Sequence, residues 1–409
     1  MPAYSFIQLL SIGLFYWSSC TNTHPNNSNL TGKECLITWG KAQTVLFDLE
    51  DRNTLDTLLE AIAADVDSAQ VVVLSEGFHN CEEMLQLQYE LVRYLVTQKG
   101  FNTIASETGL PESKYINDYI HGEAPIPDLW GKSLEILYSE WQWGRATIEW
   151  LRQHNQNAST PVDYIGVDIG GFYQDWEFPF EQIFAYLDQV DAATAHTLQK
   201  KMAFYFDKMR PYAAYHYTTK FTTVEQNQLV DLLDGLIQTF TLNAESYMAK
   251  SSPKTYHWIL QCVKAMRMAE HYYRNYQHMN DTTANKVPIY LGASGRELAM
   301  AENIRWILAT KPDAKIIVIN HVVHTKTATQ HQGDFYQYFT PMGQLLKHHL
   351  GDALFVIGMT YGGGSYWSKW QLPARRVVDT IPPTDSSGLE QVLAAIAPQH
   401  HYLSFANAP

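Results

Sequence analysis

The strongest constraint on the fold is a series of six short runs rich in apolar and β-branched residues, spread along a chain of 409 residues. Val71–Glu76 reads VVVLSE, a continuous run of the kind that is buried on both faces of a sheet. Apolar residues then recur at helical spacing over 82–98. A strand, a helix and a second strand in this order imply parallel neighbours. The remaining runs are 101–107, 163–168, 288–294, 316–321 and 354–360.

These runs predict an α/β fold with a central, largely parallel sheet flanked by helices. The hydrophobic share of 46% is large enough to bury such a sheet on both faces. Residues from about 178 to 280 differ, because long amphipathic stretches follow one another there without strand signals. We expect a helical insertion of three or four helices that packs against the sheet and forms a cap over a substrate cleft. The predicted domain covers 41–409.

The first 40 residues predict an export signal and a tether. An apolar run from Phe6 to Trp17 has the length of a signal-peptide core and is too short to span a bilayer. Ser18 and Ser19 precede Cys20, an arrangement that resembles a bacterial lipoprotein signal in which the cysteine is lipidated. Residues 21–40, which begin with a polar stretch, are expected to be a linker. We expect an exported protein whose contact with a membrane is a lipid at Cys20; a buried N-terminal segment is the alternative, since no Lys or Arg precedes Lys33.

Charge and motif content exclude several functions. The balance of 29 Lys and Arg against 42 Asp and Glu gives a net charge of −13, so the chain lacks the basic surface that binding to nucleic acid requires. The four cysteines form no CxxC pair, which argues against a zinc knuckle or a redox motif. Neither a nucleotide-binding glycine loop nor a GxSxG serine motif occurs. We therefore expect no cofactor.

Polar residues end four of the predicted strands. These residues are Glu76, Glu107, Asp168 and His321. Because parallel strands end at the same edge of a sheet, and ligands bind beyond that edge, these side chains predict a site. Asp168 alone is better explained as a cap of the following turn.

Further candidates stand close to these strand ends. His79 follows Glu76 by three residues, so the carboxylate can orient the imidazole as a general base. His324 follows His321 in an HxxH spacing, and Arg296 is expected after a turn at 292–295, at the start of a helix. Two glutamates and three histidines suit either a metal site or a metal-free hydrolytic site. The residues alone leave both possibilities open.

Segments of the chain, taken in order, resemble the erythromycin esterase family. VVLSEGFH at 72–79 is similar to its strand followed by G-E-x-x-H, and IGVDIGG at 165–171 to its G-x-D strand. GRELAMAENIRWI at 295–307 matches its R-[DE]-x-x-M-A-x-N helix, and VINHVVH at 318–324 its H-N-x-H segment. The resemblance runs from about 70 to 400.

This resemblance implies an ester hydrolase that needs no metal. The proposed catalytic histidine of the family falls on His79, its acids on Glu76 and Glu107, its arginine on Arg296, and its second histidine pair on His321 and His324. In the founding members the substrate is the macrolactone of erythromycin, cleaved by water that a histidine activates. Ser75 and Val322 stand where the family has Gly and Asn, so we expect a different small-molecule ester as the substrate. A metal-dependent hydrolase with the same residues and a non-catalytic, surface-tethered binding protein are the alternatives.

Overall fold

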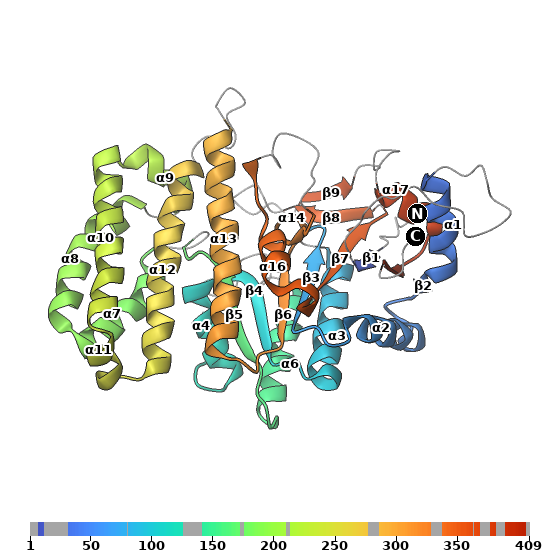
Figure 1. Ribbon diagram of the computed structural model, residues 1–409, viewed down its shortest axis with the longest axis horizontal. Coiled ribbons are helices and arrows are strands. Elements are labelled where there is room, and N and C mark those ends of the chain that lie inside the picture. Colours follow the sequence, from blue (N-terminus) through green and yellow to red (C-terminus); the bar gives the residue numbers. More distant parts are fainter. Residues whose placement is uncertain are drawn as a thin grey trace.

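A computed structural model describes residues 7–11, 32–79, 81–125, 141–171, 176–209, 213–276, 286–328, 338–362, 364–368, 377–381 and 389–405 (Figure 1). Its strands are β1 (Ile7–Ser11), β2 (Val45–Leu46), β3 (Val71–Glu76), β4 (Thr103–Gly109), β5 (Asp163–Asp168), β6 (Ile316–His321), β7 (Leu354–Tyr361), β8 (Gly364–Ser368), β9 (Val377–Ile381) and β10 (His401–Ser404). Its helices are α1 (Gly32–Gln43), α2 (Arg52–Val66), α3 (Glu82–Lys99), α4 (Leu110–Ile120), α6 (Gln142–Asn155), α7 (Phe178–Val190), α8 (Ala192–Met209), α9 (Ala213–Lys220), α10 (Thr223–Leu242), α11 (Ala244–Lys250), α12 (Pro253–Tyr276), α13 (Val287–Thr310), α14 (Val322–Thr325), α16 (Met342–Leu350) and α17 (Leu389–Ile396).

The sheet has the order β2-β10-β1-β7-β3-β6-β4-β5. The five strands from β7 to β5 are all parallel to their neighbours, and β1 joins them antiparallel to β7. In the register of β3 with β6, Glu76 lies beside His321. The predicted α/β class with a largely parallel sheet is confirmed, and five of the six expected strands are present.

Alternation along each central strand explains why helices cover both faces of the sheet. On β3, Val72 and Leu74 point into a core shared with α2, α3 and α6. Val71 and Val73 point into a separate core shared with α13 and α16. All four side chains are fully buried. The strand is therefore apolar throughout because each face has its own layer of helices to contact.

Helices α7 to α12 form a layer of their own beside the β5 edge of the sheet, drawn in green and yellow in Figure 1. Aromatic side chains such as Phe180, Phe240 and Tyr273 fill their shared core. Local signals start and end these helices: Thr222 and Glu225 form a capping box at the start of α10. The helical region expected at 178–280 is thus present, but it has six described helices instead of the three or four expected. It contacts the sheet layer through α12 against α13 and α7 against α4.

The predicted strand at 288–294 is wrong. This segment forms the first two turns of α13, with Pro288 in the first turn, where its missing N–H is harmless. Gly292 and Gly295 face α12: a Cβ on Gly292 would lie 2.4 Å from Asn275 Cβ, and one on Gly295 2.6 Å from a ring carbon of His271. Close packing of two helices therefore overrides the apolar run. Arg296 consequently lies inside α13, not at the start of a helix after a turn.

The structure describes only part of the N-terminal segment for which a signal and a linker are predicted. Cys20 and residues 21–31 lie outside the described residues. Residues 32–40 form most of α1 instead of a linker, because Leu36, Ile37 and Trp39 pack on the core around α17. Five residues of the predicted signal segment form β1, which pairs with β7 and β10. Export therefore stays a prediction. No helix among the described residues is long and apolar enough to cross a membrane.

The contact of α12 with α13 predicts opposite effects of the same change at two helical glycines. Gly292→Ala should destabilise the protein by about 1–3 kcal/mol, because the new methyl group collides with Asn275. Gly235→Ala in α10 is the matched control, since no atom lies within 4 Å of its Cβ position. It should stabilise the protein by about 0.5–1 kcal/mol through helix propensity alone. Urea unfolding of both variants measures the difference, and equal effects would contradict the packing described here.

Candidate active site

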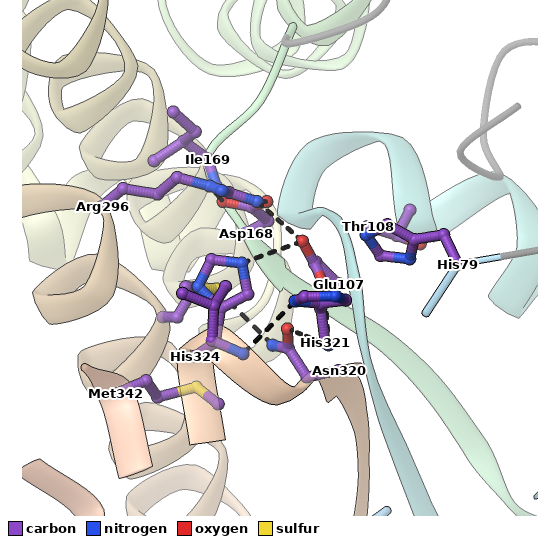
Figure 2. A network of polar contacts seen from close by, with 12 residues as sticks. His79, Glu107, Thr108, Asp168, Ile169, Arg296, Asn320, His321, His324 and Met342 are labelled. Carbon is purple, nitrogen blue, oxygen red and sulfur yellow. Dashed lines mark hydrogen bonds and ion pairs between the residues drawn. The ribbon is translucent and has the colours of Figure 1, made fainter. Parts of the chain in front are cut away.

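The polar residues predicted at the strand ends meet at one edge of the sheet. Glu76, Glu107 and His321 end or nearly end β3, β4 and β6, which are neighbours in the order β3-β6-β4. Arg296 reaches them from α13 and His324 from α14, as Figure 2 shows. The structure therefore brings together every residue that the sequence analysis named as a candidate.

Glu76 and His79 form a close pair. The Nδ1 atom of His79 lies 2.6 Å from Oε1 of Glu76, whose side chain is buried. The other oxygen of Glu76 accepts a hydrogen bond of 3.3 Å from Nε2 of Gln88 on α3. Because a carboxylate can only accept, in the neutral form that a general base requires the ring of His79 carries its proton on Nδ1 and its lone pair on Nε2. Gln88 was not predicted; the signal in the sequence was a polar residue at helical spacing between the apolar Met84 and Leu91.

Glu107 is the centre of the remaining contacts. Its Oε1 lies 3.0 Å from Nη2 of Arg296 and 3.1 Å from Nε2 of His324. Its Oε2 accepts the backbone N–H of His321 at 3.0 Å. Burial raises the pKa of Glu107, but the positive charges of His324 and Arg296 outweigh burial and hold that pKa well below its usual range. Glu107 is therefore an ionised carboxylate.

His324 lies between two carboxylates. Its Nδ1 is 2.5 Å from Oε1 of Glu297, and its Nε2 faces Glu107. Burial lowers the pKa of His324, but Glu297 and Glu107 together raise it to about 10. His324 is therefore an imidazolium ion at neutral pH, with both N–H groups bound. Glu297 is held in turn by the backbone N–H of Met342, which its Oε2 accepts at 2.9 Å.

His321 has the opposite charge state. Burial, followed by the neighbouring charge of His79, lowers the pKa of His321 to about 4. Its Nδ1 accepts the backbone N–H of Val323 at 3.2 Å, so the proton of the neutral ring is on Nε2. The rings of His79 and His321 are 4.6 Å apart between centroids. An imidazole that can accept a proton and one that can donate a hydrogen bond therefore lie side by side.

Two functional residues were missed or undervalued. Asp168 binds the Nε of Arg296 through Oδ1 at 2.9 Å and also contacts its Nη2, in addition to capping the N–H of Ile169. It is a clamp for Arg296 as well as a cap. Glu297 follows Arg296 directly in the sequence and faces the sheet edge from the same helix. The signal for Glu297 in the sequence was an acid directly after the candidate arginine; the structure shows that this acid is buried.

Among the described residues, no group of three His, Cys, Asp or Glu side chains is placed to hold a metal ion. The reason lies in the pairing: both ring nitrogens of His324 face carboxylates, and Glu107 accepts from three groups. The cluster is instead a network of ion pairs and hydrogen bonds.

Comparison with known proteins places the chain in a family. The family model of erythromycin esterase matches residues 96–409. The chain belongs to the erythromycin esterase family. It is 25% identical over 337 residues to erythromycin esterase type II of Escherichia coli, covering 80% of this chain and 77% of that protein. It is 24% identical over 134 residues to erythromycin esterase type I of Escherichia coli, covering 32% and 31%.

Solved structures share the fold of this esterase-family chain. A succinoglycan biosynthesis protein superposes with a TM-score of 0.69 at 18% identity, covering 90% of this chain and 85% of that one. A histidine variant of the erythromycin esterase EreC in its open conformation superposes with a TM-score of 0.68 at 17% identity, covering 86% of each chain. At these identities the likeness establishes the fold alone.

The ion pairs of His324 predict how stability depends on pH. The pKa of His324 is raised in the folded state, so its contribution is fully present below about pH 6.5 and is lost as pH rises through about 10. Glu297→Gln removes one of its two carboxylates and should cost about 3 kcal/mol near pH 7. Urea unfolding from pH 6 to 10 should show a fall in the free energy of unfolding that is smaller in the variant. Parallel pH profiles for both proteins would contradict a charged His324.

Proposed function

We propose that this chain hydrolyses carboxylic ester bonds of small molecules, with water activated by His79 and without a metal. The pair of Glu76 and His79 carries the proposal. A buried carboxylate 2.6 Å from Nδ1 fixes the ring and leaves the basic lone pair on Nε2. The His79 side chain keeps 16% of its surface exposed, so water can reach it. This is the arrangement that a general base requires.

The proposed reaction has two steps. In the first, Nε2 of His79 takes a proton from water while the water oxygen bonds to the ester carbonyl carbon, which gives a tetrahedral oxyanion. In the second, the oxyanion collapses, the bond from carbon to the alcohol oxygen breaks, and His79 returns its proton to the departing alkoxide. The products are a carboxylic acid and an alcohol, and His79 ends in its starting state. Glu76 stabilises the imidazolium formed in between.

His321 is the best-placed donor for the oxyanion. Its neutral ring carries hydrogen on Nε2, and the ring lies next to that of His79. Arg296 adds positive charge beyond Glu107. Preorganised donors of this kind lower the barrier because charge develops where they already point. His324 has no N–H group left for the substrate, since both are bound to carboxylates, and its role is to hold Glu107 in place.

The substrate proposal follows the departures from the family pattern. Ser75 and Val322 replace residues typical of the family, and the Oγ of Ser75 bonds to Oγ1 of Thr325 at 2.6 Å beneath the site. We therefore propose an ester other than the macrolactone of erythromycin. Tyr272 of α12 has its ring 6.0 Å from the guanidinium of Arg296, which supports the helical region as one wall of the substrate site. Export and a lipid at Cys20 remain part of the proposal.

The proposed role of His79 gives a direct test on a panel of aryl esters, acylated sugars and macrolides. His79→Ala should lower kcat/KM for any ester that the wild type hydrolyses by about 10²–10⁴-fold, because the general base is lost. His348→Ala is the matched control, since His348 is exposed on α16, and it should match the wild type. Wild-type rates in folded His79→Ala would overturn the proposed chemistry. Binding of an ester without any turnover by the wild type would favour the binding protein.

Removal of divalent metals separates the proposed mechanism from the metal-dependent alternative. After incubation with EDTA and desalting, the rate of ester hydrolysis should stay within about 20% of the untreated rate, since His79 acts without a metal. Addition of Zn²⁺ or Mn²⁺ should then have no effect. Loss of activity with EDTA, restored by one of these metals, would establish the metal-dependent alternative.

A further inference from the structure

A buried carboxylate that the proposed reaction does not use lies beside the site. Glu112 stands in the first turn of α4, directly after β4, and only 3% of it is exposed. Its Oε1 accepts the backbone N–H of Gly171 at 2.5 Å. Its Oε2 is buried and accepts no hydrogen bond from any residue that the structure describes. A buried carboxyl group with an unused oxygen is costly, so its retention needs an explanation.

The backbone around Glu112 leaves room for this carboxyl group. A Cβ on Gly109 would lie 2.2 Å from its Oε2, and a Cβ on Gly170 would lie 3.3 Å from the same atom. Gly171 adopts a φ of +75°, a left-handed conformation that other residues rarely take. Glycines at the end of β4 and in the turn after β5 therefore allow the side chain of Glu112 to connect these two segments.

The segment that Glu112 holds continues directly from the Arg296 clamp. Asp168 ends β5, and the turn at Gly170 and Gly171 follows it. Tyr273 of α12 holds the same turn, because its hydroxyl donates to the carbonyl oxygen of Gly170 at 3.0 Å. The turn is thus fixed from the sheet side by Glu112 and from the helical region by Tyr273.

We propose that Glu112 is a positioning residue that fixes the turn at Gly170 and Gly171 and thereby keeps Asp168 on Arg296. The inference rests on the proposed function, because Arg296 supplies positive charge to the oxyanion site and holds Glu107. Displacement of the turn moves Asp168, then the guanidinium, and then the carboxylate that binds the N–H of His321.

Charge supports this role in the protonated form. The titratable groups that face Glu112 are Asp168 from β5, Cys262 and Tyr273 from α12, and Tyr115 from α4. None of these four is a cation. Burial, together with the carboxylate of Asp168, raises the pKa of Glu112 to about 7. Ionisation above this pH strengthens the hydrogen bond from Gly171, but it places a second buried negative charge beside Asp168, and the raised pKa means that this repulsion and the loss of solvation outweigh the gain.

The first arm of the test measures kinetics on an ester that the wild type hydrolyses. Glu112→Ala should lower kcat by roughly ten- to a hundredfold with KM within about twofold, because the site is displaced rather than removed. Glu112→Gln, which keeps an acceptor oxygen and resembles the protonated acid, should restore kcat at pH 6. In the wild type, kcat should fall as pH rises through about 7, where Glu112 ionises. In Glu112→Gln this fall should be absent. Tyr273→Phe should lower kcat in the same direction.

Two comparisons identify the route through Arg296. Glu112→Ala added to Arg296→Ala should cause no further loss of kcat if both act on the same group, whereas independent roles multiply. Glu149→Gln is the control for the chemical change: Glu149 lies on α6, where it accepts from the hydroxyl of Tyr119 at 2.7 Å, and the variant should retain the wild-type kcat. Multiplying losses, or an unchanged kcat in folded Glu112→Ala, would overturn the inference.

The second arm does not need an activity, so it separates this inference from the proposed function. Because the pKa of Glu112 is raised in the folded state, the free energy of unfolding should fall as pH rises from about 4.5 to about 7. In Glu112→Gln the urea midpoint should depend less on pH over that range. Glu112→Ala and Asp168→Asn should shift the midpoint by less together than the sum of their single shifts. If the wild type hydrolyses no ester, the proposed function fails. The comparison of the single and double variants then decides alone whether Glu112 and Asp168 are coupled through the turn. Additive shifts would overturn the inference.

Discussion

The carboxylate of Glu107 is contacted from three elements of the fold, and the geometry of the site depends on it. Arg296 approaches from α13, His324 from α14, and the backbone N–H of His321 from the end of β6. Burying one carboxylate without partners would cost several kcal/mol, so these contacts are what allow Glu107 to stay ionised in the interior. The sheet edge and the helices beyond it therefore become ordered as one unit.

Much of the sheet and of the site could be predicted from the sequence, for a physical reason that holds residue by residue. Val71–Glu76 is apolar until its last residue, and parallel strands that end in acids and histidines must bring them to one edge. The residues of α13 by themselves do not show which helix they pack against. The first turns of α13 at 288–294 resemble a strand in sequence, but they are helical and pack closely on α12, a contact between segments that the local sequence does not show. Glu297 and Asp168 gained their roles through partners distant in sequence, His324 and Arg296.

His321 and His324 illustrate why residue type alone cannot give a role. They are three residues apart, their ring centroids are 6.5 Å apart, and both are largely buried. Burial alone lowers the pKa of each, but only His324 has carboxylates at both nitrogens, and its pKa rises to about 10 while that of His321 falls to about 4. One ring is therefore a fixed cation and the other a neutral donor. The HxxH spacing is compatible with either state, and Glu297 decides between them.

The helical region of α7 to α12 contacts the sheet edge that carries the site at more than one point. It therefore helps to position the site residues as well as covering a substrate. Gly292 and Gly295 let α12 approach α13, the helix that carries Arg296 and Glu297. Tyr273 of α12 also bonds to the turn after β5, where Asp168 is anchored. Both ends of the ion pair between Arg296 and Asp168 thus rest on the same helix.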